Sequence, residues 1–209
     1  MWLIYFSSQN YFSVCSGLLS AEGVRRYRHL TGCSRSSTMT AEAQITLAPD
    51  AVICTEAVLT GTVTIGAGTV VHPAAEIRAT NGPIIMAENN NVEELAVIEN
   101  LNPDGETMFI GRDNVFEVGS KVQAARIGNN NVFGVRCFVG PQTTVTNGCS
   151  VGVKCSAVMK EVLSENVVIY GETQTSRTAS EPPLIQSGQL EYLRKVLPSF
   201  HYLAQRASP

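Results

Sequence analysis

Apolar residues recur at every sixth position of this chain, from Leu47 to Ala157. The apolar positions, which we call anchors, are Leu47, Ile53, Leu59, Ile65, Val71, Ile77, Met86, Val92, Ile98, Ile110, Phe116, Val122, Ile127, Phe133, Val139, Val145, Val151 and Ala157. A six-residue period kept over about a hundred residues is the sequence pattern of a parallel β-helix. The pattern therefore predicts an all-β solenoid in which each hexad supplies one short strand.

Small or β-branched residues occupy the fourth position after many anchors. They are Ala51, Ala57, Val63, Thr69, Ala75, Ala96, Ser120, Cys137, Thr143, Cys149 and Cys155. Because side chains alternate between the two faces of a strand, the anchor and this second position can both point inward. One large and one small inward residue suit a narrow prism with three flat sides. At three hexads to a turn, the anchors predict about six triangular coils.

Three irregularities interrupt the period: the inserts Ala79–Ile85 and Leu101–Phe109, and a one-residue deletion after Val122. When successive hexads are assigned to sides A, B and C, starting with side A at Leu47, all three irregularities lie between side C and side A. A real coil concentrates irregularities at one corner in this way, whereas a false period would scatter them.

The same assignment places polar and glycine residues at defined corners. Asn90, Asn114 and Asn131 fall at one corner of consecutive coils, and stacked Asn side chains can hydrogen-bond along such a column. Glycine follows the anchor at several positions, where we expect a corner to need a permissive backbone. Among these glycines are Gly66, Gly111, Gly128, Gly140 and Gly152.

The C-terminal third of the chain changes character. We expect the β-helix to occupy residues 39–171, with Val162–Gly171 as a final strand leaving the stack, and residues 172–185 to form a linker. Apolar residues then recur at helical spacing, at Leu190, Leu193, Val196 and Leu197. They predict a helix from about Gln186 to Leu197, with Pro198 ending or kinking it, within a C-terminal helical segment of residues 186–204 that is followed by a tail at 205–209. The helix should cover one side of the prism and part of an open strand edge.

Residues 1–38 differ from the rest. Four arginines, several serines and the single acid Glu22 are typical of a mitochondrial transit peptide. The alternative is that the protein starts at Met39, which leads almost directly into the first coil. On either interpretation we expect this segment to be disordered or loosely packed.

Composition narrows the classes of partner. The formal net charge is -3 at pH 7, which does not indicate a nucleic-acid or anionic-membrane partner. No run of 18 apolar residues occurs, so no transmembrane helix is expected.

Cys137 and Cys155 fall at the same position one coil apart, close enough for a disulfide. Both positions point inward, however, and we interpret them as free cysteines that act as small hydrophobes.

Histidine is too scarce for the catalytic sites found in prisms of this kind. The three histidines are His29, His72 and His201, and only His72 lies within the coils, so the prism cannot supply the three ligands of a catalytic zinc. An acyltransferase needs a positioned base, and His72 is the one candidate. We therefore expect no catalytic residue, metal or cofactor, and keep a γ-carbonic anhydrase-like or hexapeptide acyltransferase-like enzyme as the alternative.

One column of ionisable residues could carry chemistry. His72, Glu93 and Glu117 each follow an anchor on side B, so they should be vertical neighbours about 5 Å apart. The specific hypothesis is a site for a metal or a proton, since stacked carboxylates perturb each other's pKa. The simpler interpretation is a solvated corner, and a third is an acidic stripe that docks a basic partner.

Several strings resemble the dynactin subunit 6 family of hexapeptide-repeat proteins. They are Ile110-Gly-Arg-Asp-Asn-Val-Phe-Glu-Val-Gly119, Gly61-Thr-Val-Thr-Ile-Gly66, Val70-Val-His-Pro73, Gly82-Pro-Ile84, Ile127-Gly-Asn-Asn-Asn-Val132, Val168-Ile-Tyr-Gly171 and the helix through Val196-Leu-Pro198. The resemblance covers residues 45–204. The insert at Asn102–Thr107 and the tail at Ser208-Pro209 are shorter than in vertebrate members.

The resemblance implies a left-handed parallel β-helix with a C-terminal helix packed on one side. It also implies a non-catalytic subunit of the pointed-end complex of dynactin, which supports dynein-driven transport and cargo attachment. The implied partners are dynactin subunit 5, dynactin subunit 4, the pointed-end actin-related protein and other dynactin subunits. The implied locations are the cytoplasm, the cytoskeleton and the kinetochore, with mitochondria as the alternative from residues 1–38. The sides left uncovered by the helix and the two inserts should contact partners, and our candidate residues are Glu93, Glu117, Arg112, Asp113 and Phe116.

Overall fold

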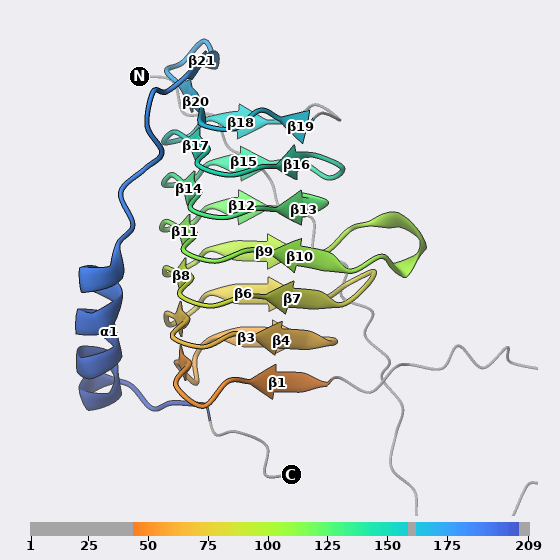
Figure 1. Cartoon of the computed structure of the whole chain (residues 1–209). Coiled ribbons are helices and arrows are strands. Elements are labelled where there is room, and N and C mark those ends of the chain that lie inside the picture. Colours follow the sequence, from red (N-terminus) through yellow and green to blue (C-terminus); the bar gives the residue numbers. More distant parts are fainter. Residues whose placement is uncertain (1–43, 159–161, 205–209) are drawn as a thin grey trace, which may run out of the picture. The chain divides into compact units, whose positions relative to one another are not determined.

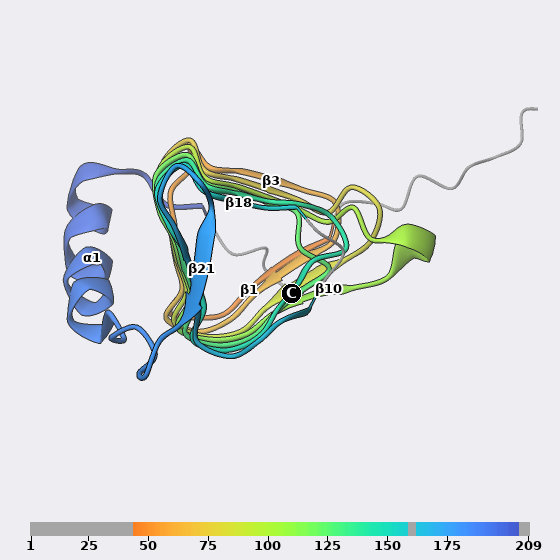
Figure 2. The ribbon, with the colours of Figure 1, turned by 90° about the horizontal axis from the view of Figure 1, so that it is seen from above.

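A computed structural model describes residues 44–158 and 162–204. The expectations for residues 1–38 and for the tail at 205–209 lie outside these ranges. The described chain winds into a parallel β-helix of triangular cross-section, with one helix beside it (Figures 1 and 2). The predicted solenoid is therefore confirmed.

Three parallel sheets form the three sides of the prism. Side A consists of β1 (Ile45–Leu47), β4 (Val63–Ile65), β7 (Ile84–Met86), β10 (Met108–Ile110), β13 (Arg126–Ile127), β16 (Thr144–Val145) and β19 (Val162–Leu163). Side B consists of β2 (Val52–Ile53), β5 (Val70–Val71), β8 (Asn91–Val92), β11 (Val115–Phe116), β14 (Val132–Phe133), β17 (Ser150–Val151), β20 (Val167–Tyr170) and the antiparallel β21 (Thr175–Thr178). Side C consists of β3 (Val58–Thr60), β6 (Glu76–Arg78), β9 (Val97–Glu99), β12 (Lys121–Val122), β15 (Phe138–Val139) and β18 (Ser156–Ala157).

The coil continues further than the hexads indicated. The segment Val162–Gly171, expected as one strand leaving the stack, forms two strands that extend sides A and B. The result is six full coils and most of a seventh. The six-residue register continues from Ala157 to Leu163 and Ile169, which are buried like the other anchors, and the extra strands were missed because the anchors were followed only to Ala157.

The anchors fill the interior of the prism. All of them are buried except Leu59, which is partly buried against the same cluster. Phe116 and Phe133 stack on consecutive coils with ring centroids 4.8 Å apart and planes inclined by 11°. Cys137, Cys149 and Cys155 occupy small inward positions as free cysteines. The interpretation of Cys137 and Cys155 as unbridged is confirmed.

An asparagine ladder runs up the corner between sides A and B, which we call the A/B corner. Oδ1 of Asn90 accepts hydrogen bonds from the backbone N and Nδ2 of Asn114, both at 3.0 Å. Oδ1 of Asn114 accepts from the same two groups of Asn131 at 3.0 and 2.9 Å. Above them, Asn131 accepts from the backbone N of Cys149 at 2.7 Å. The predicted ladder is confirmed, and all three side chains are fully buried.

The A/B corner also needs a left-handed backbone at one residue per coil. From the second coil upward this residue is Gly68, Asn89, Asp113, Asn130, Gly148 and Asn166, each with φ between 53° and 69°. These residue types adopt left-handed φ values at the lowest cost. The glycines after the anchors have a different role from the one expected. Gly111 and Gly128 lack positive φ, but a Cβ on either would collide with the backbone of the next coil.

The inserts emerge where the irregularities of the period predicted, at the corner between sides C and A. Residues 79–83 connect β6 to β7, and residues 100–107 connect β9 to β10. The second insert contains the short 3₁₀ helix η1 (Pro103–Gly105) and projects away from the prism (Figure 2). Asn102 ties its base to the coil by donating from Nδ2 to the carbonyl oxygen of Ala125 at 3.0 Å.

The single α-helix of the described residues, α1, spans Ser187–Phe200 and includes Pro198 in its last turn. The helix was expected near these bounds, but Pro198 does not end it. The preceding segment, expected as a linker over 172–185, contains β21, which pairs with β20. No helix among the described residues is long and apolar enough to span a membrane.

Candidate docking surfaces

Side B is covered by α1 over its first coils. Leu190 and Leu197 on the helix pack against the outward residues Val52, Cys54 and Val70. All five side chains are at most 8% exposed. The covering role predicted for the helix is thus confirmed. The outer face of side B is not a free surface at these coils, because α1 lies against it (Figure 2).

The same C-terminal segment closes both edges of sheet B. At the last coil, β21 pairs with β20 along four residues. At the first coil, the chain after α1 runs antiparallel to the end of β2: Thr55 N donates to Tyr202 O at 2.9 Å and Ala204 N donates to Ile53 O at 2.8 Å. Open sheet edges invite pairing with other chains, so side B is protected on its edges and on the covered part of its face.

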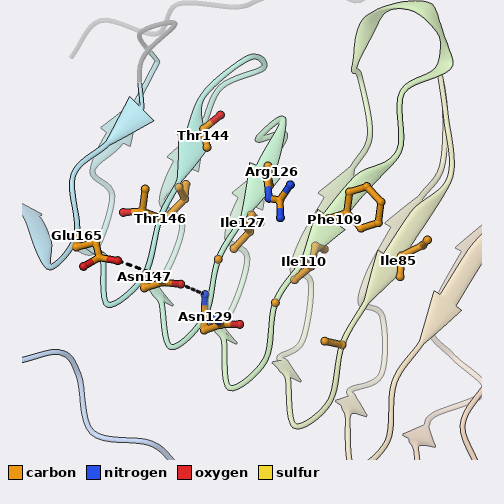
Figure 3. A pocket seen from close by; sticks show the side chains of 14 residues that line it. Ile85, Phe109, Ile110, Arg126, Ile127, Asn129, Thr144, Thr146, Asn147 and Glu165 are labelled. Atoms are coloured by element: carbon orange, nitrogen blue, oxygen red, sulfur yellow. Dashed lines mark hydrogen bonds between the residues drawn. The ribbon is translucent and has the colours of Figure 1, made fainter.

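Side A carries an open groove of about 550 Å³, which we call the side A groove (Figure 3). Its apolar part is formed by the outward residues Ile85 and Phe109 on β7 and β10, which are 40% and 44% exposed. Arg126 and Thr144 continue the row on β13 and β16. Exposed apolar side chains on adjacent strands, bordered by polar ones, are typical of a protein interaction site.

Arg126 lies over the ring of Phe109, with its guanidinium carbon 5.7 Å from the ring centroid. The two residues are in register on adjacent coils. A guanidinium over an aromatic face is stabilised by the ring quadrupole. The pair therefore places a cationic and an apolar group side by side on the outer face of side A.

A chain of side-chain bonds borders the groove on the A/B corner side. Oδ1 of Asn129 accepts from the backbone N of Arg112 at 3.0 Å, and Oδ1 of Asn147 accepts from the backbone N of Asn129 at 2.8 Å. Nδ2 of Asn147 donates to Glu165 at 2.9 Å. This exposed second ladder gives the groove a polar rim with fixed orientation (Figure 3).

Side C repeats the combination of a ring and a cation on a smaller scale. Nζ of Lys121 on β12 lies 6.0 Å from the ring centroid of Phe138 on β15. Val58 on β3 is 46% exposed on the same side. Because α1 packs on side B, sides A and C are the two faces that the helix leaves uncovered.

Of the five candidate contact residues, Arg112 and Asp113 lie together at the A/B corner. Nε of Arg112 is 3.7 Å from Oδ2 of Asp113, and NH1 of Arg112 is 3.8 Å from Glu88. Asp113 also supplies the left-handed residue of its coil, with φ of 59°. Its identity is therefore explained by the turn, while Arg112 remains an exposed candidate.

Glu93 and Glu117 lie at the corner between sides B and C and have equivalent backbone contacts. Oε2 of Glu93 accepts from the backbone N of Val118 at 3.1 Å, and Oε2 of Glu117 accepts from that of Val135 at 2.9 Å. Each carboxylate thus bonds a corner N–H of the next coil. Burial, followed by the charge of Glu117, raises the pKa of Glu93 despite the bond from Val118.

The prediction that Phe116 contacts a partner is wrong. It is an anchor, its exposed fraction is 0%, and its ring stacks inside the prism on Phe133. Sequence reasoning missed Phe109, Ile85 and Arg126, which form the side A groove instead. A usable signal was present, because each directly precedes an anchor and so points outward on its strand.

His72 does not form a site with Glu93 and Glu117. Its Nδ1 lies 3.0 Å from Oε1 of Glu94, a residue outside the predicted column. Partial burial raises the pKa of Glu94, but the hydrogen bond with His72 and the charges of His72 and His201 outweigh it, so the pKa is lowered. Within residues 44–158 and 162–204, no group of three or more His, Cys, Asp and Glu side chains could hold a metal ion.

Comparison with known proteins gives a consistent result. No family model matches the chain. The chain is 46% identical over 168 residues to dynactin subunit 6 of Xenopus tropicalis, covering 76% of this chain and 84% of that protein. It is 44% identical over 178 residues to dynactin subunit 6 of Danio rerio, covering 80% and 91%.

Two other matches concern enzymes. A carbonic anhydrase of Methanosarcina thermophila is 34% identical over 125 residues, which is 58% of this chain and 49% of that protein. A crystal structure of a hexapeptide transferase family protein from Anaplasma phagocytophilum superimposes with a TM-score of 0.59 at 16% identity, covering 76% and 90%. The second match indicates a shared fold alone. On its extended similarity to the animal proteins, the chain belongs to the dynactin subunit 6 family.

Proposed function

We propose that this chain is a non-catalytic structural and docking subunit of the dynactin pointed-end complex. In this role it supports dynein-driven transport along microtubules and the attachment of cargo. Its partners are dynactin subunit 5, dynactin subunit 4, the pointed-end actin-related protein and other dynactin subunits. It acts in the cytoplasm, on the cytoskeleton.

The observation that carries this proposal is the division of the prism into a covered side and two uncovered ones. The C-terminal segment covers side B over its first coils and pairs with both edges of its sheet. Side A carries the exposed Phe109 and side C the partly buried Phe138, each with a cation from the adjacent coil over its ring. A rigid solenoid with uncovered faces offers extended docking surfaces, the usual role of such repeats.

The experiment is affinity capture of the full-length chain, tagged at its C-terminus and expressed in cells of its own organism. We expect dynactin subunits 4 and 5 and the actin-related protein among the captured proteins, identified by mass spectrometry. Capture of no dynactin subunit would overturn the proposal. Measurable CO₂ hydration, or acyl-CoA turnover lost in His72→Ala, would favour the enzyme alternative instead.

A further inference from the structure

Arg126 is an exposed cation at the centre of side A. None of the ion pairs among the described residues includes it. Its guanidinium carbon lies over the Phe109 ring, 5.7 Å from the ring centroid. A guanidinium carries its N–H groups in a planar fork that can bind a carboxylate through two hydrogen bonds.

Two hollows meet at the Phe109–Arg126 pair. One is the side A groove, and the other has a volume of about 410 Å³ and lies against the second insert. The second hollow is lined by Asn102, Glu106, Thr107, Phe109, Ala125 and Arg126. Residues that dominate binding energy in protein interfaces include arginine and are typically surrounded by contacts that exclude water. The Phe109–Arg126 pair has the residue types of such a dominant binding position, and the hollows on either side of it leave room for side chains of a partner.

The carboxylates of this face lie at its margins. Glu165 is at the far end of the groove and accepts a hydrogen bond from Asn147. Glu106 is exposed on the insert, where it lines the second hollow, and it forms no ion pair with Arg126 among the described residues. The centre of the face is therefore cationic and apolar, and it complements a segment that places an acid beside an apolar side chain.

We infer that side A binds an acidic segment of a dynactin partner subunit. A carboxylate of this segment pairs with Arg126, and a neighbouring apolar side chain enters the side A groove beside Phe109. This inference rests on the proposed function and specifies which face is used and which chemistry recognises the partner.

The test compares charge reversal on the two uncovered sides in the captured complex. Arg126→Glu should reduce the captured amount of at least one dynactin subunit by about tenfold or more, because it turns an attractive contact into a repulsive one. Arg126→Lys should reduce the captured amount less than Arg126→Glu does, because lysine keeps the positive charge but lacks the two parallel N–H donors of the guanidinium. Arg177→Glu reverses the charge of an exposed side chain on β21, outside sides A and C, and is the matched control, which should retain that subunit within about twofold. Lys121→Glu makes the same change on side C and tells which of the two uncovered sides the subunit uses. Thermal unfolding of each purified variant should match the wild type, because these side chains are exposed.

A photoreactive benzoylphenylalanine in place of Thr144 identifies the occupant. We expect it to cross-link in cells to a peptide of a dynactin subunit that contains Asp or Glu next to an apolar residue. A cross-link to a second copy of this chain, to residues 1–43, or to a basic peptide would overturn the inference.

The two proposals fail in different ways. If the wild type captures dynactin subunits and Arg126→Glu captures them equally well, only the assignment of side A is wrong. If Lys121→Glu reduces the capture of a dynactin subunit and Arg126→Glu does not, the interface lies on side C and the assignment of side A is again wrong. If the wild type captures no dynactin subunit, the proposed function fails and this inference fails with it.

Discussion

Asn131 donates both its backbone N–H and its side-chain Nδ2 to the single Oδ1 of Asn114, at 3.0 and 2.9 Å. Asn114 in turn donates the same two groups to Asn90 and gives a further bond from Nδ2 to the carbonyl oxygen of Gly128 at 3.0 Å. Each asparagine thus satisfies backbone groups of two coils at a corner where strand pairing is interrupted. Because all three residues are fully buried, water cannot replace a lost partner.

Replacing Asn114 with Ala should be strongly destabilising. The substitution leaves the backbone N–H of Asn131 and the carbonyl oxygen of Gly128 without these partners in a buried corner. It also removes the Nδ2 that donates to Oδ1 of Asn90 and the Oδ1 that accepts from Nδ2 of Asn131. Buried unsatisfied groups cost about 1–3 kcal/mol each, so we expect a loss of roughly 2–5 kcal/mol in the free energy of unfolding. Denaturant unfolding of the purified chain measures it.

Asn147→Ala is the matched control, since Asn147 forms the same kind of bond to the backbone N of Asn129 on the exposed ladder. Water can satisfy the released groups there, so the loss should be no more than about 1 kcal/mol. Equal losses in the two variants would mean that burial of the ladder is not what gives it its strength.

The scaffold was predictable from sequence because every coil repeats the same physical constraint. The interior accepts one apolar anchor and one small residue per hexad, and the A/B corner accepts only residues such as Asn89, Asp113 and Gly148 that tolerate a left-handed backbone. Repetition multiplies these weak local preferences into an unambiguous register. The ladder followed from that register alone, because residues one coil apart must be neighbours.

The candidate surface was not predictable in the same way. The period predicts that Ile85, Phe109 and Arg126 point outward, because each precedes an anchor, but it does not predict which residue type stands there, since outward positions are free to vary. Phe116 was selected because it belongs to a distinctive string, although its anchor position already required it to point inward. The pairing of Leu203 with Cys54 could not be predicted either, because no local sequence pattern indicates which strand the chain after a helix will pair with.

The helix α1 should control the reactivity of Cys54. The Cys54 side chain is fully buried beneath the helix, and burial, with the nearby charges of Glu56 and Glu94, raises its pKa to about 11. Leu190→Asp places an acid in the buried contact and should release the helix. The thiol pKa would then fall toward about 8.5, which raises the thiolate fraction at pH 8 by roughly two orders of magnitude. Iodoacetamide labelling at pH 8, followed peptide by peptide by mass spectrometry, measures the rate at Cys54.

Glu191→Ala serves as the control, because Glu191 lies on the same helix but faces solvent, where it pairs with Lys195 at 2.7 Å. Labelling at Cys54 should stay at the wild-type rate in this variant. Labelling of Cys137, buried in the prism interior, should stay slow in both variants. If labelling at Cys54 stays slow in Leu190→Asp, something other than the helix protects the thiol.

Glu93 and Glu94 are adjacent carboxylates with pKa shifts of opposite sign, and this opposition predicts opposite effects of charge removal. For Glu93 the folded-state pKa is raised, first by burial, so its charged form opposes folding at pH 7. Glu93→Gln keeps an oxygen that can accept from Val118 and removes the charge. The variant should therefore be more stable at pH 7, by no more than about 1 kcal/mol because the side chain is partly solvated. The gain should fade as the pH falls through the raised folded-state pKa and be gone below about 4.3, the pKa of an unperturbed Glu, where Glu93 is protonated in both states.

Glu94→Gln should behave in the opposite way. The pKa of Glu94 is lowered in the folded state, because the hydrogen bond with His72 and the surrounding charges together outweigh the effect of burial. Its charged form therefore favours folding above the unfolded pKa, and that contribution is lost as the pH falls through the folded pKa. Glu94→Gln should lower the melting temperature at pH 7 and match the wild type at the acid end. Thermal unfolding of both variants between pH 3 and 7.5 decides the matter, and shifts of the same sign at pH 7 would refute the assignment of the two carboxylates.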